Sequence, residues 1–303
     1  MPLNNMESTK IHKAGFVNII GNPNVGKSTL MNALVGERIS IVTAKAQTTR
    51  HRIMGIVNGE DYQIVYSDTP GILKPNYGLQ ERMMQFVETA IGDADIILYV
   101  TDVVEKSTKN EEYIDKLNKV NSPVLLVINK IDLSSQAGME EIYKRWQELV
   151  PKAEIFPVSA TEKFNLDSLF NRILELIPAN PAWYDKDVLT DRNLRFFASE
   201  IIREKILLNY GKEIPYCTEV VIDSFQEKED IYHIDAIIYV MRDSQKGIII
   251  GNKGTSLKRV GTQARIDMEA FFEKRVFLQT FVKVNPNWRE DKRKLKQFGY
   301  ILD

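Results

Sequence analysis

The sequence contains Gly21-Asn22-Pro23-Asn24-Val25-Gly26-Lys27-Ser28, which fits the phosphate-binding pattern G-x-x-x-x-G-K-S/T. Residues 16–20 before it are apolar and β-prone, and residues 29–34 after it, beginning with Thr29, have a helical pattern. This strand–loop–helix context favours a phosphate-binding loop over a glycine-rich turn that matches by chance. Backbone N–H groups of such a loop close on phosphate oxygens, and the helix N-terminus adds a favourable dipole. We therefore expect Lys27 to contact the β- and γ-phosphates of a nucleotide and Ser28 to ligate Mg²⁺.

The composition is that of an ordinary globular protein. The 303 residues suggest about two domains, and 44% of them are apolar and 27% charged. Cys217 is the only cysteine, which excludes a disulfide framework, and it has no metal-ligand spacing with His12, His51 or His233. No apolar run has the length of a membrane span, and the polar start at residues 2–13 is unlike a signal peptide. These features predict a cytoplasmic protein.

The charge is unevenly distributed along the chain. The formal net charge is −1, but residues 241–300 hold 14 lysines and arginines against 6 acids, which leaves +8 there and −9 elsewhere. Such an asymmetry indicates a C-terminal surface for an anionic partner. Within this region, Lys292-Arg293-Lys294 fits a solvated helix face and a contact with that partner equally well.

A polar stretch at residues 43–52 follows the first helix and contains Gln47-Thr48-Thr49-Arg50. It is too polar and irregular to suggest a core element, and a loop in this position suits a nucleotide-dependent switch. A threonine hydroxyl there completes the Mg²⁺ shell when the γ-phosphate is present. Thr48 and Thr49 are both candidates, and Thr49 is the residue we expect; an exposed polar loop without this role is the alternative.

A second phosphate motif is Asp68-Thr69-Pro70-Gly71, followed by Ile72. Asp68 ends an apolar strand pattern, where a carboxylate holds Mg²⁺ through water, and the Gly71 N–H has no side chain to keep it from the γ-phosphate. Alone D-x-x-G is a weak signal, but about 40 residues after a phosphate-binding loop it is a strong one.

A third motif specifies the base. Asn129-Lys130-Ile131-Asp132 follows a buried-strand pattern at residues 124–128. In a phosphate-loop protein N-K-x-D binds guanine, because the Asp132 carboxylate accepts from N1–H and the 2-amino group while the Lys130 stem lies along the base. After a further strand pattern, Ser159 and Ala160 are small enough for their backbone N–H groups to reach the guanine oxygen.

The first 180 residues alternate between β and α patterns, which predicts an α/β domain with ligand loops at the carboxyl ends of its strands. We expect a mixed, mostly parallel sheet with helices on both faces over residues 1–180 and a linker at 181–194. Strands are expected at 52–57, 63–67, 96–102, 124–128 and 155–158, and helices at 79–91, 110–119, 139–149 and 166–177.

The last part, residues 195–303, has the pattern of an α+β domain: a helix at 196–208, a hairpin of strands at 218–225 and 231–241, then a helix and a strand at 276–284. Between hairpin and helix, Ile250-Gly251-Asn252-Lys253-Gly254 matches the I-G-x-x-G signature of a KH domain, here of type II. Its loop clamps the backbone of single-stranded RNA, with Lys258 and Arg259 adding charge. The apolar residues Ile248, Ile249 and Leu257 are expected to accommodate bases.

Taken together, G-N-P-N-V-G-K-S, Q-T-T-R-H and D-T-P-G resemble the Era family within the translation-factor-related GTPases. Other small GTPases carry a water-orienting Gln where this chain has Ile72, so the usual hydrolysis mechanism does not apply. The residues expected to act on the γ-phosphate are Lys27, Thr49, Gly71 and Asn24. The resemblance implies that Asn24 holds K⁺ beside the phosphates; shaping the loop is its other candidate role.

The resemblance covers nearly the whole chain and implies binding of GTP and GDP with Mg²⁺. It further implies a monomer whose KH domain binds the 3′ end of 16S ribosomal RNA in 30S subunit assembly and rRNA maturation, with loose association at the inner membrane. The alternative is a GTP-dependent RNA-binding switch with little catalysis that regulates growth or the cell cycle. A third class, the tRNA-modifying and iron-transport GTPases, fits less well because the former lack a KH domain and the latter span membranes.

Overall fold

The computed structural model describes residues 11–105 and 110–301, so most of the polar start lies outside the described part of the chain. The described residues form two compact units. The first comprises residues 11–37, 53–69, 89–105 and 110–191, and the second comprises residues 38–52, 70–88 and 192–301. No helix among these residues combines the length and apolarity needed to cross a bilayer.

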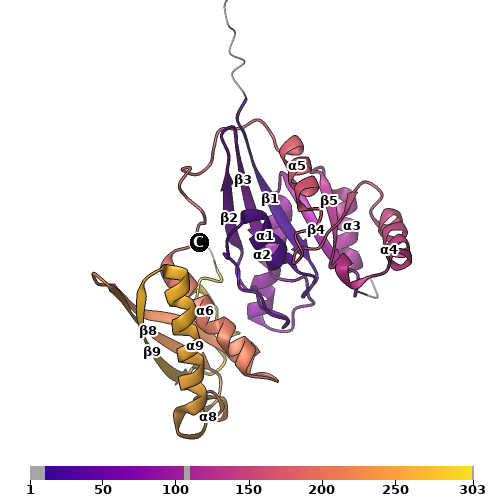
Figure 1. The fold of residues 1–303 in the computed structure, drawn as a ribbon. Coiled ribbons are helices and arrows are strands. Elements are labelled where there is room, and N and C mark those ends of the chain that lie inside the picture. Colours follow the sequence, from indigo (N-terminus) through magenta and orange to yellow (C-terminus); the bar gives the residue numbers. More distant parts are fainter. Residues whose placement is uncertain (1–10, 106–109, 302–303) are drawn as a thin grey trace, which may run out of the picture. The chain divides into compact units, whose positions relative to one another are not determined.

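A six-stranded sheet of order β2-β3-β1-β4-β5-β6 forms the centre of the first unit (Figure 1). All neighbouring strands are parallel except β2 and β3, which pair antiparallel. This confirms the mixed, mostly parallel sheet. The strands are β1 (Lys13–Gly21), β2 (Ile53–Asn58), β3 (Tyr62–Asp68), β4 (Ile96–Asp102), β5 (Val124–Asn129) and β6 (Glu154–Pro157).

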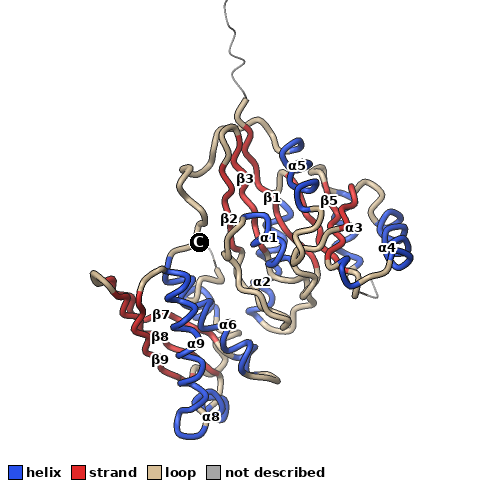
Figure 2. Tube along the Cα trace, viewed as in Figure 1, coloured by secondary structure: helices blue, strands red, loops and turns tan. Residues whose placement is uncertain are grey.

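Helices flank this sheet and connect its parallel strands (Figure 2). All seven residues of β4 are buried, as expected for a parallel strand covered on both faces. In α5, Leu166, Leu169 and Ile173 recur at helical spacing and are its buried residues. The helices of the first unit are α1 (Lys27–Val35), α3 (Glu111–Lys119), α4 (Gln136–Leu149) and α5 (Leu166–Leu176), and most of α2 (Gly78–Gly92) belongs to the second unit.

The parallel order brings the carboxyl ends of β1, β3, β4 and β5 to one edge of the sheet. The register pairs Ile19 of β1 with Asp68 of β3, and Asp102 of β4 with Asn129 of β5. In open α/β sheets this edge is where ligands bind, so the loops that carry the three nucleotide motifs converge there.

The second unit contains a three-stranded sheet of order β7-β8-β9. β7 and β8 pair antiparallel, and β8 and β9 parallel. The expected helix–strand–strand–helix–strand order is confirmed for α6, β7, β8, α9 and β9. The helices α7 and α8 were not predicted, and α10 contains Lys292-Arg293-Lys294, for which a helix face was one of two interpretations. The elements are α6 (Leu194–Asn209), α7 (Ile214–Cys217), β7 (Glu219–Glu227), β8 (Ile231–Val240), α8 (Asp243–Ile250), α9 (Thr255–Phe272), β9 (Arg275–Val284) and α10 (Lys292–Gln297).

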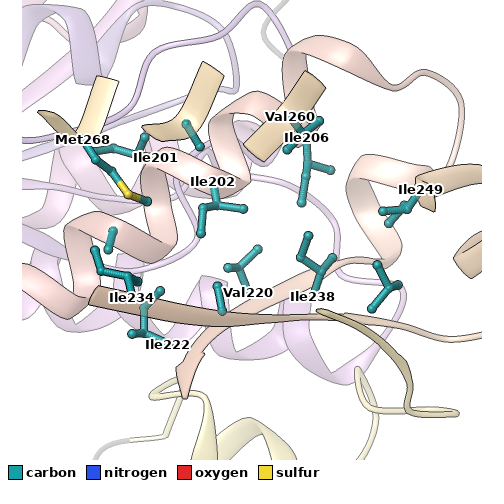
Figure 3. Close-up of a cluster of buried hydrophobic side chains, with 14 of the residues drawn as sticks. Ile201, Ile202, Ile206, Val220, Ile222, Ile234, Ile238, Ile249, Val260 and Met268 are labelled. Atoms are coloured by element: carbon teal, nitrogen blue, oxygen red, sulfur yellow. The ribbon is translucent and has the colours of Figure 1, made fainter. Parts of the chain in front are cut away.

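The core of this unit lies between its helices and one face of its sheet. Figure 3 shows Ile202 and Ile206 of α6 and Ile249 of α8 directed toward Val220 and Ile238 of the strands. Ile249 is fully buried, so the expectation that it accommodates bases was wrong. Its neighbour Ile248 is 49% exposed, because adjacent positions on a helix lie on different faces.

We predict that Ile202→Ala lowers the free energy of unfolding by about 2–5 kcal/mol, since the fully buried side chain leaves a cavity in this core. Urea unfolding measures the loss. Ile266→Ala on α9 is the control: its side chain is 52% exposed, and its effect should stay within about 0.5 kcal/mol. Equal losses in both variants would contradict the assignment of the core.

Candidate functional site

The loop between β1 and α1 needs glycine at two positions. At Gly21 a Cβ would lie 2.1 Å from the Val100 carbonyl oxygen, and at Gly26 it would lie 2.3 Å from Nδ2 of Asn129. Both glycines have positive φ, as does Asn24 at 66°. The motif glycines therefore allow the loop to pass close to the ends of β4 and β5.

Lys27 is 6% exposed and lies under this loop, where Nζ donates to the carbonyls of Gly21 (3.1 Å) and Asn22 (2.9 Å). Burial lowers the pKa of its ammonium group to about 8, and the charges of Asp68 and Glu105 oppose that shift. The loop thus surrounds a buried cation, which suits a polyanionic ligand.

The structure brings together two of the three residues expected to hold Mg²⁺. The Ser28 hydroxyl donates to Oδ2 of Asp68 over 2.6 Å, and Asp68 is fully buried at the end of β3. A hydroxyl and a carboxylate at this distance offer the hard oxygen ligands that Mg²⁺ prefers. Thr69 is oriented by donating to the Ile19 carbonyl over 2.7 Å.

The other switch residues belong to the second unit. Because Thr49, Pro70, Gly71 and Ile72 belong to that unit, their positions relative to Ser28 and Asp68 are not defined. The Thr48 hydroxyl is used locally: it donates to the Lys45 carbonyl over 2.6 Å and lies 2.6 Å from the Thr43 hydroxyl.

The base motif joins three loops of the first unit. The Asn129 side chain donates to the Val25 carbonyl and accepts from the Ala160 N–H, both over 3.0 Å. Oδ1 of Asp132 accepts from the Ser159 hydroxyl over 2.6 Å. Asn129 therefore connects the phosphate loop to the loop after β6, and Ser159 fixes the carboxylate that we expect to meet the base.

Two acids at this edge were not predicted as site residues. Nζ of Lys130 lies 2.6 Å from Oδ2 of Asp102 at the end of β4, and it also donates to the Asn24 carbonyl over 2.6 Å. Glu105 accepts from the Thr101 hydroxyl over 2.9 Å and from the Asn22 amide. No motif marks them; their only sequence signal is their place after a buried strand.

Residues 43–52 do not form the exposed loop of the alternative prediction. Arg50 is fully buried in the second unit, where it donates to the carbonyls of Thr218 (2.7 Å) and Pro215 (2.9 Å) and pairs with Glu219 (3.1 Å). His51 stacks on Tyr300 with ring centroids 4.3 Å apart. The expectation that this stretch is too polar for a core was wrong, because the buried Arg50 guanidinium finds three partners far along the chain. Arg50 Nε and His51 Nδ1 form no hydrogen bond within the described residues.

The glycine motif of the second unit forms an exposed turn between α8 and α9. Gly251 and Gly254 have φ of 72° and 80°, and a Cβ at Gly251 would lie 2.3 Å from the Ser256 hydroxyl. Between them, Asn252 and Lys253 are exposed. The turn therefore presents backbone and one cation to solvent, as a phosphate clamp requires.

An open groove of about 350 Å³ begins at this turn and runs between α9 and β9. Of the predicted RNA-binding residues, Lys258 lines it, Arg259 is exposed but does not line it, and Ile250 packs on the core. Three polar residues that line the groove were not predicted from the sequence. They are Thr262, Arg265 and Thr280.

Comparison with known proteins places two stretches of the chain in families. Residues 16–130 match the family model described as 50S ribosome-binding GTPase, and residues 213–289 match the KH domain model. The chain is 44% identical over 291 residues to GTPase Era of Geobacter metallireducens, covering 95% of this chain and 98% of that protein. GTPase Era of Clostridium kluyveri is 42% identical over 290 residues, covering 95% and 99%.

Two solved structures resemble the whole chain, each with a TM-score of 0.91 and each covering 96% of this chain and all of the other. One, 36% identical, is Era in complex with MgGDPNP and nucleotides 1506–1542 of 16S ribosomal RNA. The other, 37% identical, is a variant of Aquifex aeolicus Era bound to GDP·AlF4⁻. With its phosphate loop, guanine motif and KH domain, this chain belongs to the Era family of GTPases.

Proposed function

We propose that this chain couples GTP hydrolysis to binding of the 3′ end of 16S ribosomal RNA, and that it acts in 30S subunit assembly and rRNA maturation. One observation carries the proposal: the chain resembles, over nearly all of its length, the Era structure that holds MgGDPNP and 16S rRNA nucleotides. We assign GTP binding to a domain at residues 1–180 and RNA binding to a domain at residues 195–303. Residues 181–194 link the two domains.

Nucleotide binding is assigned to the loops at the carboxyl edge of the six-stranded sheet. Lys27 and the loop N–H groups bind the phosphates, and Asp132 and Lys130 bind guanine. Ser28, Asp68 through water, and Thr49 hold Mg²⁺, which offsets the charge of the phosphates. The Ser28–Asp68 distance of 2.6 Å supports the first two of these ligands. The remaining contacts are assigned to the motif neighbours Gly21–Asn24, Val25, Gly26, Thr29, Thr69–Ile72, Asn129, Ser159 and Ala160.

Hydrolysis is assigned to Lys27, Thr49, Gly71 and Asn24, with Asn24 holding K⁺ beside the phosphates in place of the missing Gln. RNA binding is assigned to Ile250–Gly254, Lys258 and Arg259. The exposed Lys253 and the groove that begins at Gly254 support the latter assignment. We further propose that the protein is a cytoplasmic monomer with peripheral membrane association.

Asp132→Asn should lose affinity for GTP and gain affinity for xanthosine triphosphate. The amide cannot accept from both N1–H and the 2-amino group, and it offers a donor that matches the xanthine oxygen. Titration with both nucleotides measures the change. GTP binding equal to that of the wild type would contradict the assignment of Asp132 to the base.

GTP turnover should be about tenfold or more faster in K⁺ than in Na⁺ at equal ionic strength, because a cation beside the phosphates stabilises developing charge. Asn24→Gly should abolish the difference. Glycine is the suitable replacement because Asn24 has φ of 66°, so the side chain is removed without backbone strain. If wild type turns over equally in both salts, K⁺ has no role.

The double change Asn252→Asp and Lys253→Asp should weaken RNA binding by at least ~2 kcal/mol, about thirtyfold, because two carboxylates then face phosphates. GTP affinity and RNA-free hydrolysis should survive. Filter binding to a 3′-terminal 16S rRNA oligonucleotide and a GTPase assay measure the two activities. Lys152→Asp, an exposed position of the first unit, is the control for charge. Unchanged RNA affinity in the double variant would refute the RNA site.

A further inference from the structure

The three-stranded sheet of the second unit has an outer face, opposite the core, that is only partly covered. Residues 285–301 cover one end of it. Tyr239 of β8 contacts Phe298 with ring centroids 5.5 Å apart, and Glu219 of β7 accepts from the Tyr300 hydroxyl over 2.7 Å. Trp288 is fully buried in the same segment.

The other end of this face exposes two phenylalanines. Along β9 the side chains alternate, so that Val276 and Val282 are buried while Phe277 is 46% and Phe281 49% exposed. Gln279 lies between them on the same face and is also exposed. We call Phe277, Gln279 and Phe281 the β9 outer face. Two aromatic rings that face solvent from the same strand indicate an interaction site rather than a packing requirement.

The distance between the two phenylalanines of this face suits the bases of a single-stranded nucleic acid. With a rise of about 3.3 Å per residue, Phe277 and Phe281 are about 13 Å apart, and Gln279 is midway. Unstacked bases of an extended strand are further apart than the about 3.4 Å of a duplex strand. One base can therefore stack on each ring while a base between them meets the Gln279 amide. His233, opposite Phe277 on β8 and 5.2 Å from it between ring centroids, widens the first platform.

The charges at the two ends of the β9 outer face favour binding of a polyanion. Arg275 and Lys283 flank the β9 outer face on the same strand, and Lys283 forms no ion pair within the described residues. Arg275 pairs with the exposed Asp230 at 3.5 Å. One carboxylate, Asp235, lies half-buried opposite Gln279. A carboxylate accepts from the exocyclic amino group of a base, so it does not oppose an RNA strand whose phosphates lie at the two cations.

The face is continuous with the groove assigned to RNA. β9 is an edge strand of its sheet, and the side chains between those of the outer face, Leu278 and Thr280, line the groove beside α9. A strand of RNA that leaves the groove at β9 thus has only the edge of one strand to cross before it reaches Phe277 and Phe281.

We propose that the β9 outer face is a second stacking surface for single-stranded RNA, which extends the KH groove around the edge of the sheet. This inference rests on the proposed function, because the groove must first hold RNA. It assigns base stacking to Phe277 and Phe281, base-edge contact to Gln279, and phosphate contacts to Arg275 and Lys283.

The test compares two RNA oligonucleotides that carry the 3′-terminal 16S sequence, one of about five nucleotides that fills the groove alone and one of about twelve. Phe277→Leu with Phe281→Leu keeps apolar side chains but removes the rings. It should weaken binding of the longer oligonucleotide at least about tenfold and leave the shorter one unchanged. Phe277→Tyr with Phe281→Tyr should keep wild-type affinity. In a 5-iodouridine version of the longer oligonucleotide, crosslinks should map to Phe277 or Phe281.

Phe164→Leu, at a 59% exposed position of the first unit, controls for loss of an exposed ring. Wild-type affinity of the Leu double variant for the longer oligonucleotide would overturn the inference. An equal loss for both lengths would also overturn it, since the face would not then be separable from the groove. A wild-type dimer that the Leu change dissociates in sedimentation would identify a self-association surface instead. If wild type binds neither oligonucleotide, the proposed function itself fails.

Discussion

The nucleotide site depends on the hydrogen bonds of the Asn129 side chain. This side chain donates to the phosphate loop at Val25 and accepts from Ala160, and a Cβ at residue 26 would collide with it. These contacts exist because β1, β4 and β5 are parallel and end at one edge, where Gly21 pairs with Val100 and Asp102 with Asn129. The order of the strands therefore sets the positions of the site loops, and the glycines let the phosphate loop pass close to the ends of β4 and β5.

The second unit depends on a different constraint, the burial of charged groups beside partners of opposite charge. Arg50 has no exposed surface, and it is neutralised by Glu219, which also accepts from Tyr300. Arg203 pairs with Glu200 at 2.5 Å and donates to the carbonyls of Gln47 and Thr48. Removing one partner of such a buried pair typically costs about 3–5 kcal/mol. Residues 43–52 are thus held by specific contacts rather than by apolar packing.

Sequence patterns predicted most of the fold and the motif-bearing loops, because apolar periodicity and glycine spacing follow directly from strand, helix and turn geometry. They failed where burial depends on partners far along the chain. Arg50 was assigned to a polar loop because Thr218 and Glu219 are distant in sequence. Ile249 was assigned to the RNA surface because a run of three isoleucines does not show which one faces the core. Asp102 and Glu105 belong to no motif, and only the sheet order brings them to the site.

This GTPase of the Era family carries a KH domain, to which we assign binding of the 3′ end of 16S ribosomal RNA. The most direct measurement is ultraviolet crosslinking of the full chain to RNA in cells, with sequencing of the bound fragments and mapping of the crosslinked peptides. We expect fragments concentrated at the 3′ end of 16S rRNA and crosslinks at residues 250–259. Fragments spread over cellular RNA in proportion to abundance, or crosslinks confined to the first unit, would contradict this assignment.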